Sequence, residues 1–253
     1  MNLGVGGRTE SGLAVSRLGF GTAGLGRSLS RGERLRLLET AFDSGITYFD
    51  TAPLYGAGAA EEALGAFLRG TPDGVTVATK AGILPAPVAA LVLSRLIGRA
   101  AVARGGRFTP GALRASLESS LRRLRVARVD LLLLHEVTAA AVDESVLAEL
   151  DAAVRRGDVA HVGIATNASE AAAILAGAGT FPEVVQVPAD PAPPDVGARR
   201  LVVHSALVGR AGAPGELLRK AAVRYPSARL LFGSRQPAHV RETVQSFLED
   251  RTG

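Results

Sequence analysis

Four residues with acid–base side chains stand at or just after the ends of short apolar segments. Asp50 ends the segment ITYFD, Lys80 ends VTVATK and His135 ends VDLLLLH, while Tyr55 follows Asp50 in DTAPLYG. Burying a lysine is costly unless a carboxylate pairs with it, and Asp50 is the natural partner of Lys80. A tyrosine beside that ammonium would have its pKa lowered from about 10 towards neutrality. These residue types therefore predict general acid catalysis with Tyr55 as the proton donor.

Each of these residues also has a structural interpretation. An aspartate at a strand end often caps a turn, and a single histidine such as His135 is often a hydrogen-bonded core residue. Lys80 fits that interpretation least, because the chain has only two lysines, Lys80 and Lys220. The four residues together are more specific than any one of them. Schiff-base chemistry at Lys80 is a minor alternative.

Short apolar segments alternate along the chain with segments of helical periodicity. Strands are predicted over 18–22, 46–50, 75–79, 129–135, 161–165, 184–187, 201–204 and 230–232. Helices are predicted over 31–43, 59–68, 110–123, 142–156, 169–175, 214–223 and 237–248. This alternation indicates parallel strands with crossover helices. Eight strands in 253 residues favour an α/β fold of the (β/α)8 TIM barrel type, as a single domain over residues 1–253.

The barrel prediction places the four residues at one rim. The C-terminal ends of barrel strands share a face, and active sites lie there. The alternative fold is an open doubly wound sheet, but GFGTAGLG at 19–26 does not have the GxGxxG spacing of a dinucleotide-binding turn.

Two connections depart from a regular barrel. The segment between the sixth and seventh strands contains PAPP, and proline blocks helix interiors, so we expect that crossover helix to be reduced or missing. Residues 82–108 form a long insertion after the third strand. Their apolar part could form a helix over the barrel mouth, and a packed helix with no role in chemistry is an equal alternative.

Composition excludes several classes of protein. A chain with 47% hydrophobic and 21% charged residues is not disordered, and one without cysteine has neither disulfides nor a thiolate metal site. Its histidines and carboxylates lack metal-ligand spacing, so we expect no metal. The net charge of +5 is spread along the chain, which argues against a nucleic-acid partner. No apolar run reaches the roughly 18 residues of a membrane span, and the start lacks the basic and apolar regions of a secretory signal. We therefore expect a cytoplasmic protein with no membrane partner.

Several motifs in order along the chain resemble those of the aldo-keto reductase family. They are LGFGTAGLG (18–26), GITYFDTAPLYG (45–56), VTVATKAG (75–82), SLRRLRVARVDLLLLH (120–135), HVGIATN (161–167), VVQV (184–187) and LLFGSRQPAHVRET (230–243). The resemblance implies a barrel oxidoreductase that reduces an aldehyde or ketone by hydride transfer from NADPH. It places the catalytic tetrad of the family on Asp50, Tyr55, Lys80 and His135. In that family the tyrosine protonates the developing alkoxide, the lysine and aspartate tune the tyrosine, and the histidine orients the carbonyl oxygen.

The resemblance also implies the contacts of the cofactor. Asn167 and Gln186 fall where the family binds the nicotinamide carboxamide. Gly233, Ser234 and Arg235 precede the last predicted helix, where free N–H groups and a guanidinium suit a phosphate. The remaining implied contacts are Gly21, Thr22, Asp50, His204, Ser205, Leu207, Arg210 and Arg241, and Gln236 is a further candidate.

The chain also departs from the family pattern. His204 stands where many members have an aromatic ring against the nicotinamide, and the C-terminal part is short. Aromatic residues make up only 4% of the chain, so aliphatic groups must replace the usual aromatic walls of the pocket. Leu25, Leu54, Val137 and the 82–108 insertion are the candidates. An aliphatic, open mouth would suit a bulky hydrophobic ketone.

Three functional hypotheses follow from these residues. The first is carbonyl reduction of a small molecule by a monomer or weak homo-oligomer. The second is a barrel that keeps the tetrad but performs another step, such as a dehydration, an isomerisation or the reduction of a C=N bond. The third is a non-catalytic binding protein on the same scaffold.

Overall fold

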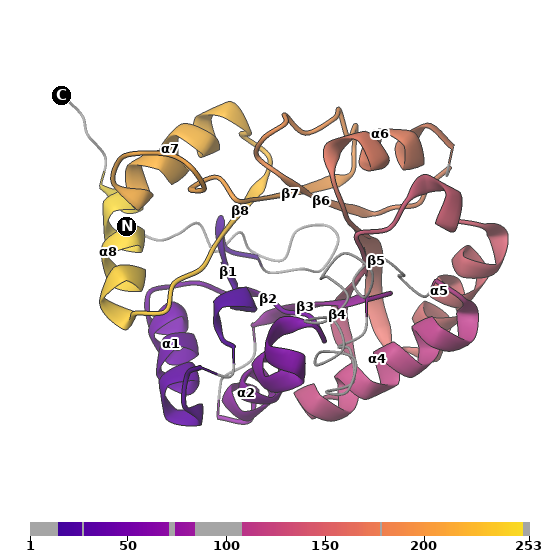
Figure 1. Ribbon diagram of the computed structural model, residues 1–253, viewed down its shortest axis with the longest axis horizontal. Helices are drawn as coiled ribbons and strands as arrows, with labels where there is room; N and C mark the ends of the chain where they lie inside the picture. Colours follow the sequence, from indigo (N-terminus) through magenta and orange to yellow (C-terminus); the bar gives the residue numbers. More distant parts are fainter. Residues whose placement is uncertain (1–14, 27, 71–73, 84–107, 178, 250–253) are drawn as a thin grey trace, which may run out of the picture.

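Eight parallel strands close into a barrel in the order of the sequence, with the helices outside it (Figure 1). The computed structural model describes residues 15–26, 28–70, 74–83, 108–177 and 179–249. The strands are β1 (Leu18–Gly21), β2 (Tyr48–Asp50), β3 (Thr76–Ala81), β4 (Val129–His135), β5 (Val159–Ala165), β6 (Val184–Pro188), β7 (Arg200–His204) and β8 (Arg229–Phe232). The helices are α1 (Arg31–Asp43), α2 (Ala59–Leu68), α4 (Pro110–Leu124), α5 (Glu144–Arg156), α6 (Ala168–Gly177), α7 (Pro214–Arg224) and α8 (Pro237–Leu248). The predicted (β/α)8 barrel is confirmed.

Local sequence signals start several helices where the periodicity predicts them. Ser30 and Glu33 form a reciprocal capping box at the start of α1. The side chains of Thr109 and Asp143 accept backbone N–H groups at the starts of α4 and α5. Proline, which lacks the N–H that a first turn leaves unpaired, begins α4, α7 and α8. Because Asp143 is a cap, α5 begins at Glu144, two residues after the predicted start.

Alternation along the strands separates two apolar layers. One lies between the strands and the helices, and the other fills the barrel interior. Tyr48, Ala78 and Leu133 belong to the interior layer and stand two residues before Asp50, Lys80 and His135. Side chains two apart on a strand share a face, so this layer lies directly beneath the three polar residues. Gly19 provides space for it, because a Cβ at that position would lie 2.5 Å from the Tyr48 ring.

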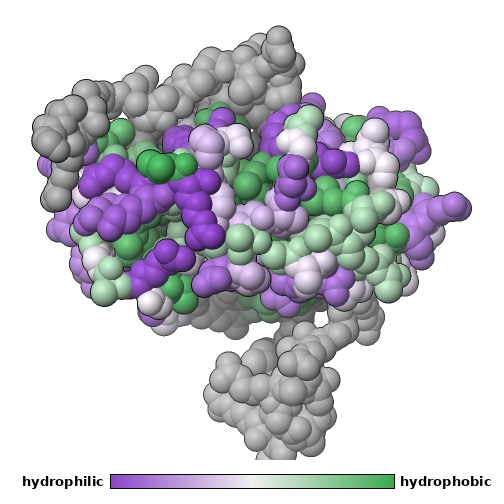
Figure 2. Space-filling model, turned by 90° about the horizontal axis from the view of Figure 1, so that it is seen from above, coloured by the Kyte–Doolittle hydropathy of each residue, from purple (hydrophilic) through white to green (hydrophobic). Residues whose placement is uncertain are grey.

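The connection between β6 and β7 lacks a helix, as the prolines predict. Residues 189–199 form bends and turns, and the Tyr225 hydroxyl donates to the Ala189 carbonyl at 3.2 Å. Figure 2 shows the molecule from above, a face on which hydrophilic and hydrophobic side chains are interspersed. The other predicted departure, the insertion after β3, lies outside the described residues over 84–107.

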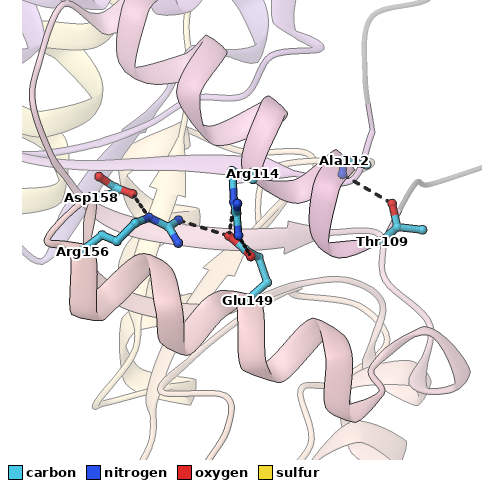
Figure 3. A network of polar contacts seen from close by, with 6 residues as sticks. All are labelled: Thr109, Ala112, Arg114, Glu149, Arg156 and Asp158. Carbon is cyan, nitrogen blue, oxygen red and sulfur yellow. Dashed lines mark hydrogen bonds and ion pairs between the residues drawn. The ribbon is translucent and has the colours of Figure 1, made fainter.

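Helices α4 and α5 are joined by an ionic network centred on Glu149 (Figure 3). The nearly buried Glu149 carboxylate accepts two N–H groups of Arg114, at 2.6 and 3.1 Å, and one of Arg156 at 3.1 Å. Arg156 also donates to Asp158 at 2.8 Å, just before β5. The network therefore connects two helices on the outside of β4.

A second buried ion pair connects α2, α4 and β3. The Glu61 side chain is 0% exposed and accepts the Thr79 hydroxyl at 2.7 Å and Arg123 Nε at 2.5 Å. Thr79 and Lys80 are consecutive on β3, so their side chains point to opposite sides of the sheet. Thr79 thus anchors the strand to the outer helices while Lys80 points into the barrel.

Candidate active site

The strand ends bring Asp50, Tyr55, Lys80 and His135 to one cavity of about 1140 Å³. Asp50 and Lys80 lie at the ends of neighbouring strands, and β3 pairs in turn with β4, which ends at His135. Tyr55 begins the short 3-10 helix η2 (Tyr55–Gly58) that follows β2. The predicted convergence of four residues distant along the chain is therefore present in the structure.

Asp50 and Lys80 form a buried ion pair at the base of this cavity. Lys80 Nζ lies 2.6 Å from Asp50 Oδ1 and donates to the Thr51 carbonyl at 3.0 Å, and the two side chains are only 1% and 4% exposed. Burial by itself would lower the lysine pKa, but Asp50 and Tyr55 outweigh it and raise that pKa above its ordinary value. Lys80 is therefore a permanent cation, which argues against a role as a neutral amine nucleophile.

Tyr55 lies close to this cation without becoming acidic. Lys80 Nζ is 5.0 Å from the centroid of the Tyr55 ring. The pKa of Tyr55 is nevertheless raised, because burial of the phenol outweighs the opposing effect of the ammonium. The expectation of a lowered phenol pKa is therefore wrong. Its cause is desolvation, which depends on the packing around the ring rather than on the neighbouring residue types.

His135 faces Tyr55 and is neutral at physiological pH. The two rings meet edge to face with centroids 6.2 Å apart. Burial, together with the charge of Lys80, lowers the His135 pKa to about 3. Nδ1 of His135 is buried and has no hydrogen-bond partner among the described residues. A neutral imidazole has one N–H to donate, so His135 can orient an oxygen atom near the Tyr55 hydroxyl.

Two amide side chains, Asn167 and Gln186, line the cavity beside the four residues. Asn167 Oδ1 accepts the Ser169 hydroxyl at 2.6 Å and the Glu170 N–H at 3.0 Å at the start of α6, which leaves its NH2 group to donate. Gln186 Oε1 is buried and has no partner in the part of the chain that the structure describes. One available donor and one available acceptor complement a carboxamide, which has both.

The end of the cavity formed by β8 and the start of α8 is suited to an anion. Gly233, Ser234 and Arg235 line it just before α8, whose first turn has no side-chain cap. Uncapped N–H groups and the helix dipole attract negative charge. Arg235 Nη2 donates to the Ser28 hydroxyl at 2.6 Å, which holds its guanidinium at this end.

Most other predicted site residues also line the cavity, but some do not. Gly21, His204, Ser205 and Leu207 line it, with Gln236. Thr22 is fully buried, Arg210 is exposed on the loop after β7, and neither lines the cavity.

Arg241 lines a separate hollow with Ser44 and Leu248, so its predicted contact with the cofactor is not supported. The reason is helical geometry. His239 lies one turn after Gln236 and lines the cavity, whereas Arg241 lies about 200° further around α8.

The aliphatic residues proposed for the substrate pocket are also placed elsewhere. Leu25 and Val137 are fully buried in the layer between strands and helices, and Leu54, 43% exposed, does not line the cavity. The side chains of Leu25 and Val137 belong to the packed core outside the strands. The expectation of an aliphatic pocket built from these three residues is therefore wrong.

Sequence reasoning missed a group of polar residues at the cavity. Glu136, Thr138, Glu170 and His239 all line it. Glu136 has a positive φ of 51°, is exposed, and contributes to the raised pKa of Tyr55. Its position directly after His135 at a strand end was the signal that could have identified it.

The described residues contain neither a metal-binding cluster nor a membrane-spanning helix. No group of three or more histidine, cysteine, aspartate or glutamate side chains there could hold a metal ion. None of the described helices is both long and apolar enough to span a membrane.

Comparison with known proteins identifies similar sequences. Residues 17–202 match the model of the aldo/keto reductase family. The chain is 38% identical over 174 residues to D-threo-aldose 1-dehydrogenase from a Pseudomonas species, covering 64% of this chain and 53% of that protein. It is 47% identical over 78 residues to pyridoxal 4-dehydrogenase from Microbacterium luteolum, covering 30% and 23% respectively. These alignments span about half or less of the length of the curated relatives.

Solved structures of similar fold cover nearly the whole chain. A protein from Pseudomonas aeruginosa described as an aldo-keto reductase is 26% identical, with a TM-score of 0.75 and 95% coverage of both chains. An aldo-keto reductase from Klebsiella pneumoniae, solved with NADP and acetate, is 20% identical, with a TM-score of 0.74 and coverage of 97% of this chain and 90% of that one. The second similarity concerns the fold alone.

Proposed function

The chain belongs to the aldo/keto reductase family, and on that premise we propose that it is an NADPH-dependent oxidoreductase that interconverts a carbonyl group and an alcohol. The observation that carries this proposal is the convergence of Asp50, Tyr55, Lys80 and His135 on one cavity. The buried Asp50–Lys80 pair supports it further, because a binding module has no need for a desolvated cation beside a phenol.

In the proposed mechanism a bound nicotinamide would supply the hydride, and side chains of the protein would supply the proton. Tyr55 donates its hydroxyl proton to the carbonyl oxygen as negative charge develops there. Its raised pKa keeps it protonated at neutral pH, and the nearby Lys80 ammonium stabilises the phenolate that forms. Asp50 holds the ammonium in place, and neutral His135 donates an N–H to the same oxygen.

The residues at both ends of the cavity are suited to NADPH. Gln186 Oε1 would accept the carboxamide N–H, and the Asn167 amide would donate to the carboxamide oxygen. Arg235 and the uncapped start of α8 would hold a phosphate, and we assign them to the 2′-phosphate that distinguishes NADPH from NADH.

Polar side chains after β4 offer contacts for a substrate that carries hydroxyl groups, and apolar groups such as Ile83 and Leu207 line the same cavity. Glu136 and Thr138 follow His135 in the chain and line the cavity with Glu170. Their oxygen atoms are hydrogen-bond acceptors for substrate hydroxyl groups. Two relatives are named as dehydrogenases of an aldose and of pyridoxal. We therefore propose a carbonyl compound that carries hydroxyl groups near the reacting carbon, or the corresponding alcohol.

A cofactor titration followed by a turnover assay tests this function. Quenching or enhancement of NADPH fluorescence should give a saturable binding curve, with weaker binding of NADH. Absorbance of the reduced cofactor should then fall when a short polyhydroxylated aldehyde is added, and more slowly with a polycyclic ketone of equal concentration. A faster reaction with the ketone would contradict the substrate class but not the chemistry.

Other outcomes distinguish the alternative functions. Absence of binding at millimolar NADPH and NADH would contradict the oxidoreductase proposal and support a non-catalytic protein. Cofactor binding without turnover of carbonyl compounds or alcohols would support a different step at the same site, such as the reduction of a C=N bond.

A further inference from the structure

A hollow of about 510 Å³ lies on the outer flank of the barrel, lined by residues of helices α1, α2 and α4. Its wall is dominated by arginine. The charged residues that line it are Arg31, Arg34, Arg122, Arg123, Arg125 and Glu62. In Figure 1 the three helices are neighbours, with α2 between α1 and α4. No residue of this hollow lines the larger cavity.

Only two of the five guanidinium groups are paired within the described part of the chain. Arg123 bonds Glu61, and Arg34 donates to the carbonyls of Gly26 and Leu29. Arg31, Arg122 and Arg125 make no hydrogen bond or ion pair with any described residue.

Positive charge is concentrated in this hollow. Five guanidinium groups stand against the carboxylates of Glu61 and Glu62, an excess of three charges in a chain whose total is +5. Arginines gathered in a concave site repel one another, and an anion placed among them would relieve that repulsion.

The ordinary role of arginine at helix ends explains only part of this arrangement. Arg122 and Arg123 lie in the last turn of α4, where a cation is favoured by the helix dipole. Arg31, by contrast, is the first residue of α1, at the end where the dipole favours an anion. Arg125 has φ 59° and ψ 39°, a left-handed conformation that favours glycine, as Gly157 shows at the end of α5.

We propose that this hollow is a binding site for a small anion that carries two or more phosphate groups. Guanidinium groups bind phosphate oxygens through paired N–H donors, and the three that have no partner among the described residues can share a multivalent anion. The volume is that of a small-molecule pocket rather than an extended nucleic-acid surface. Glu62 is the carboxylate of the lining, and its negative charge would repel such an anion.

The test is calorimetric titration of inorganic tripolyphosphate into the full chain at low ionic strength. Substitutions in the hollow leave the larger cavity unchanged, because no residue lines both. The probe variant combines Arg122→Gln with Arg125→Gly. Glycine suits the left-handed backbone at position 125, so removal of that guanidinium should not destabilise the fold. The control is Arg155→Gln, which removes an exposed arginine of α5 whose ion pair among the described residues is with Asp151.

The proposal expects saturable binding by the unmodified chain and a dissociation constant raised about tenfold or more in the double variant. Arg155→Gln should change it by less than about twofold, and Glu62→Gln should lower it. Orthophosphate should bind more weakly than tripolyphosphate. Equal affinities for the double variant and the unmodified chain, equal losses in the double variant and the control, or no binding at millimolar tripolyphosphate would each overturn the assignment.

Discussion

The side of the cavity built from β2, β3 and β4 contains a buried ion pair, whereas the side built from β5 to β8 has no ion pair among the lining residues that the structure describes. Buried atoms without a partner among the described residues occur on both sides, Asp50 Oδ2 and His135 Nδ1 on the first and Gln186 Oε1 on the second. On the first side, the Lys80 ammonium has a carboxylate and a carbonyl as partners. Behind that side, Glu61 and Glu149 each have at least two hydrogen-bond donors. On the second side, α8 begins without a side-chain cap.

The outer walls differ in the same way. Ion pairs link α2 to α4 and α4 to α5. The ion pair of α7 lies within that helix, and the connection from β6 to β7 has no helix at all. The comparison teaches that the charge beside Tyr55 is held by a buried ion pair within the protein, whereas the groups proposed for the cofactor are uncharged amides, uncapped N–H groups and the Arg235 guanidinium. Substitutions on the first side should therefore lower turnover or stability, and substitutions on the second side should weaken binding of the cofactor.

The largest expected effect is that of Tyr55→Phe on turnover. Removal of the hydroxyl removes the proposed proton donor, and a positioned acid contributes about 10²- to 10⁴-fold to rate. The rate constant for carbonyl reduction should fall by that factor, measured from the absorbance of NADPH, while the dissociation constant of NADPH stays nearly unchanged. A variant that retains most of its turnover would remove Tyr55 from the mechanism.

Lys80→Met should have the next largest effect, which is a decrease in the free energy of unfolding. The substitution leaves the Asp50 carboxylate buried without its cation, a change that costs about 3–5 kcal/mol of unfolding free energy. The matched control is the other lysine, Lys220→Met, whose exposed pair with Glu216 contributes at most about 1 kcal/mol. Denaturant titrations followed by circular dichroism measure both changes.

The pH dependence of this loss identifies its cause. A carboxylate that has lost its cation is costly to bury in the charged form. As the pH falls, protonation removes that charge, so the difference between Lys80→Met and the unmodified chain should become smaller. If Lys80→Met lowered the unfolding free energy at pH 7 by as little as Lys220→Met does, the buried ion pair would not distinguish the first side from the second.

Gln186→Leu should have the smallest effect, and only on cofactor binding. Leucine removes the unpartnered oxygen without leaving a cavity, so the unfolding free energy without cofactor should change by less than about 1 kcal/mol. The dissociation constant of NADPH should rise about tenfold through the loss of one hydrogen bond. An unchanged dissociation constant would show that the second side does not depend on this residue.

The elements and the positions of the acid–base residues could be predicted from sequence because both depend on local patterns. Apolar segments bounded by helix caps indicate strands and helices, and their alternation determines that the strands run parallel. The ends of parallel strands then meet at one rim, which places Asp50, Lys80 and His135 together. The proline run after β6 likewise determined the missing helix.

Other features could not be predicted because they depend on which side of an element faces the cavity. Leu25 and Val137 follow strand ends as Tyr55 and Glu136 do, yet they pack outward. On α8, two residues separate His239, which lines the cavity, from Arg241, which does not. The arginine-lined hollow combines residues from α1, α2 and α4, about ninety positions apart.

The amino-acid sequence by itself determined the barrel, the order of its strands and the residue types available for acid–base chemistry. Tertiary structure alone decided the electrostatic state of those residues. The pKa of Tyr55 is raised because burial outweighs the neighbouring ammonium, and that of His135 is lowered to about 3 because it is buried beside the same cation. Desolvation and charge act through distances in space, and no pattern along the chain records those distances.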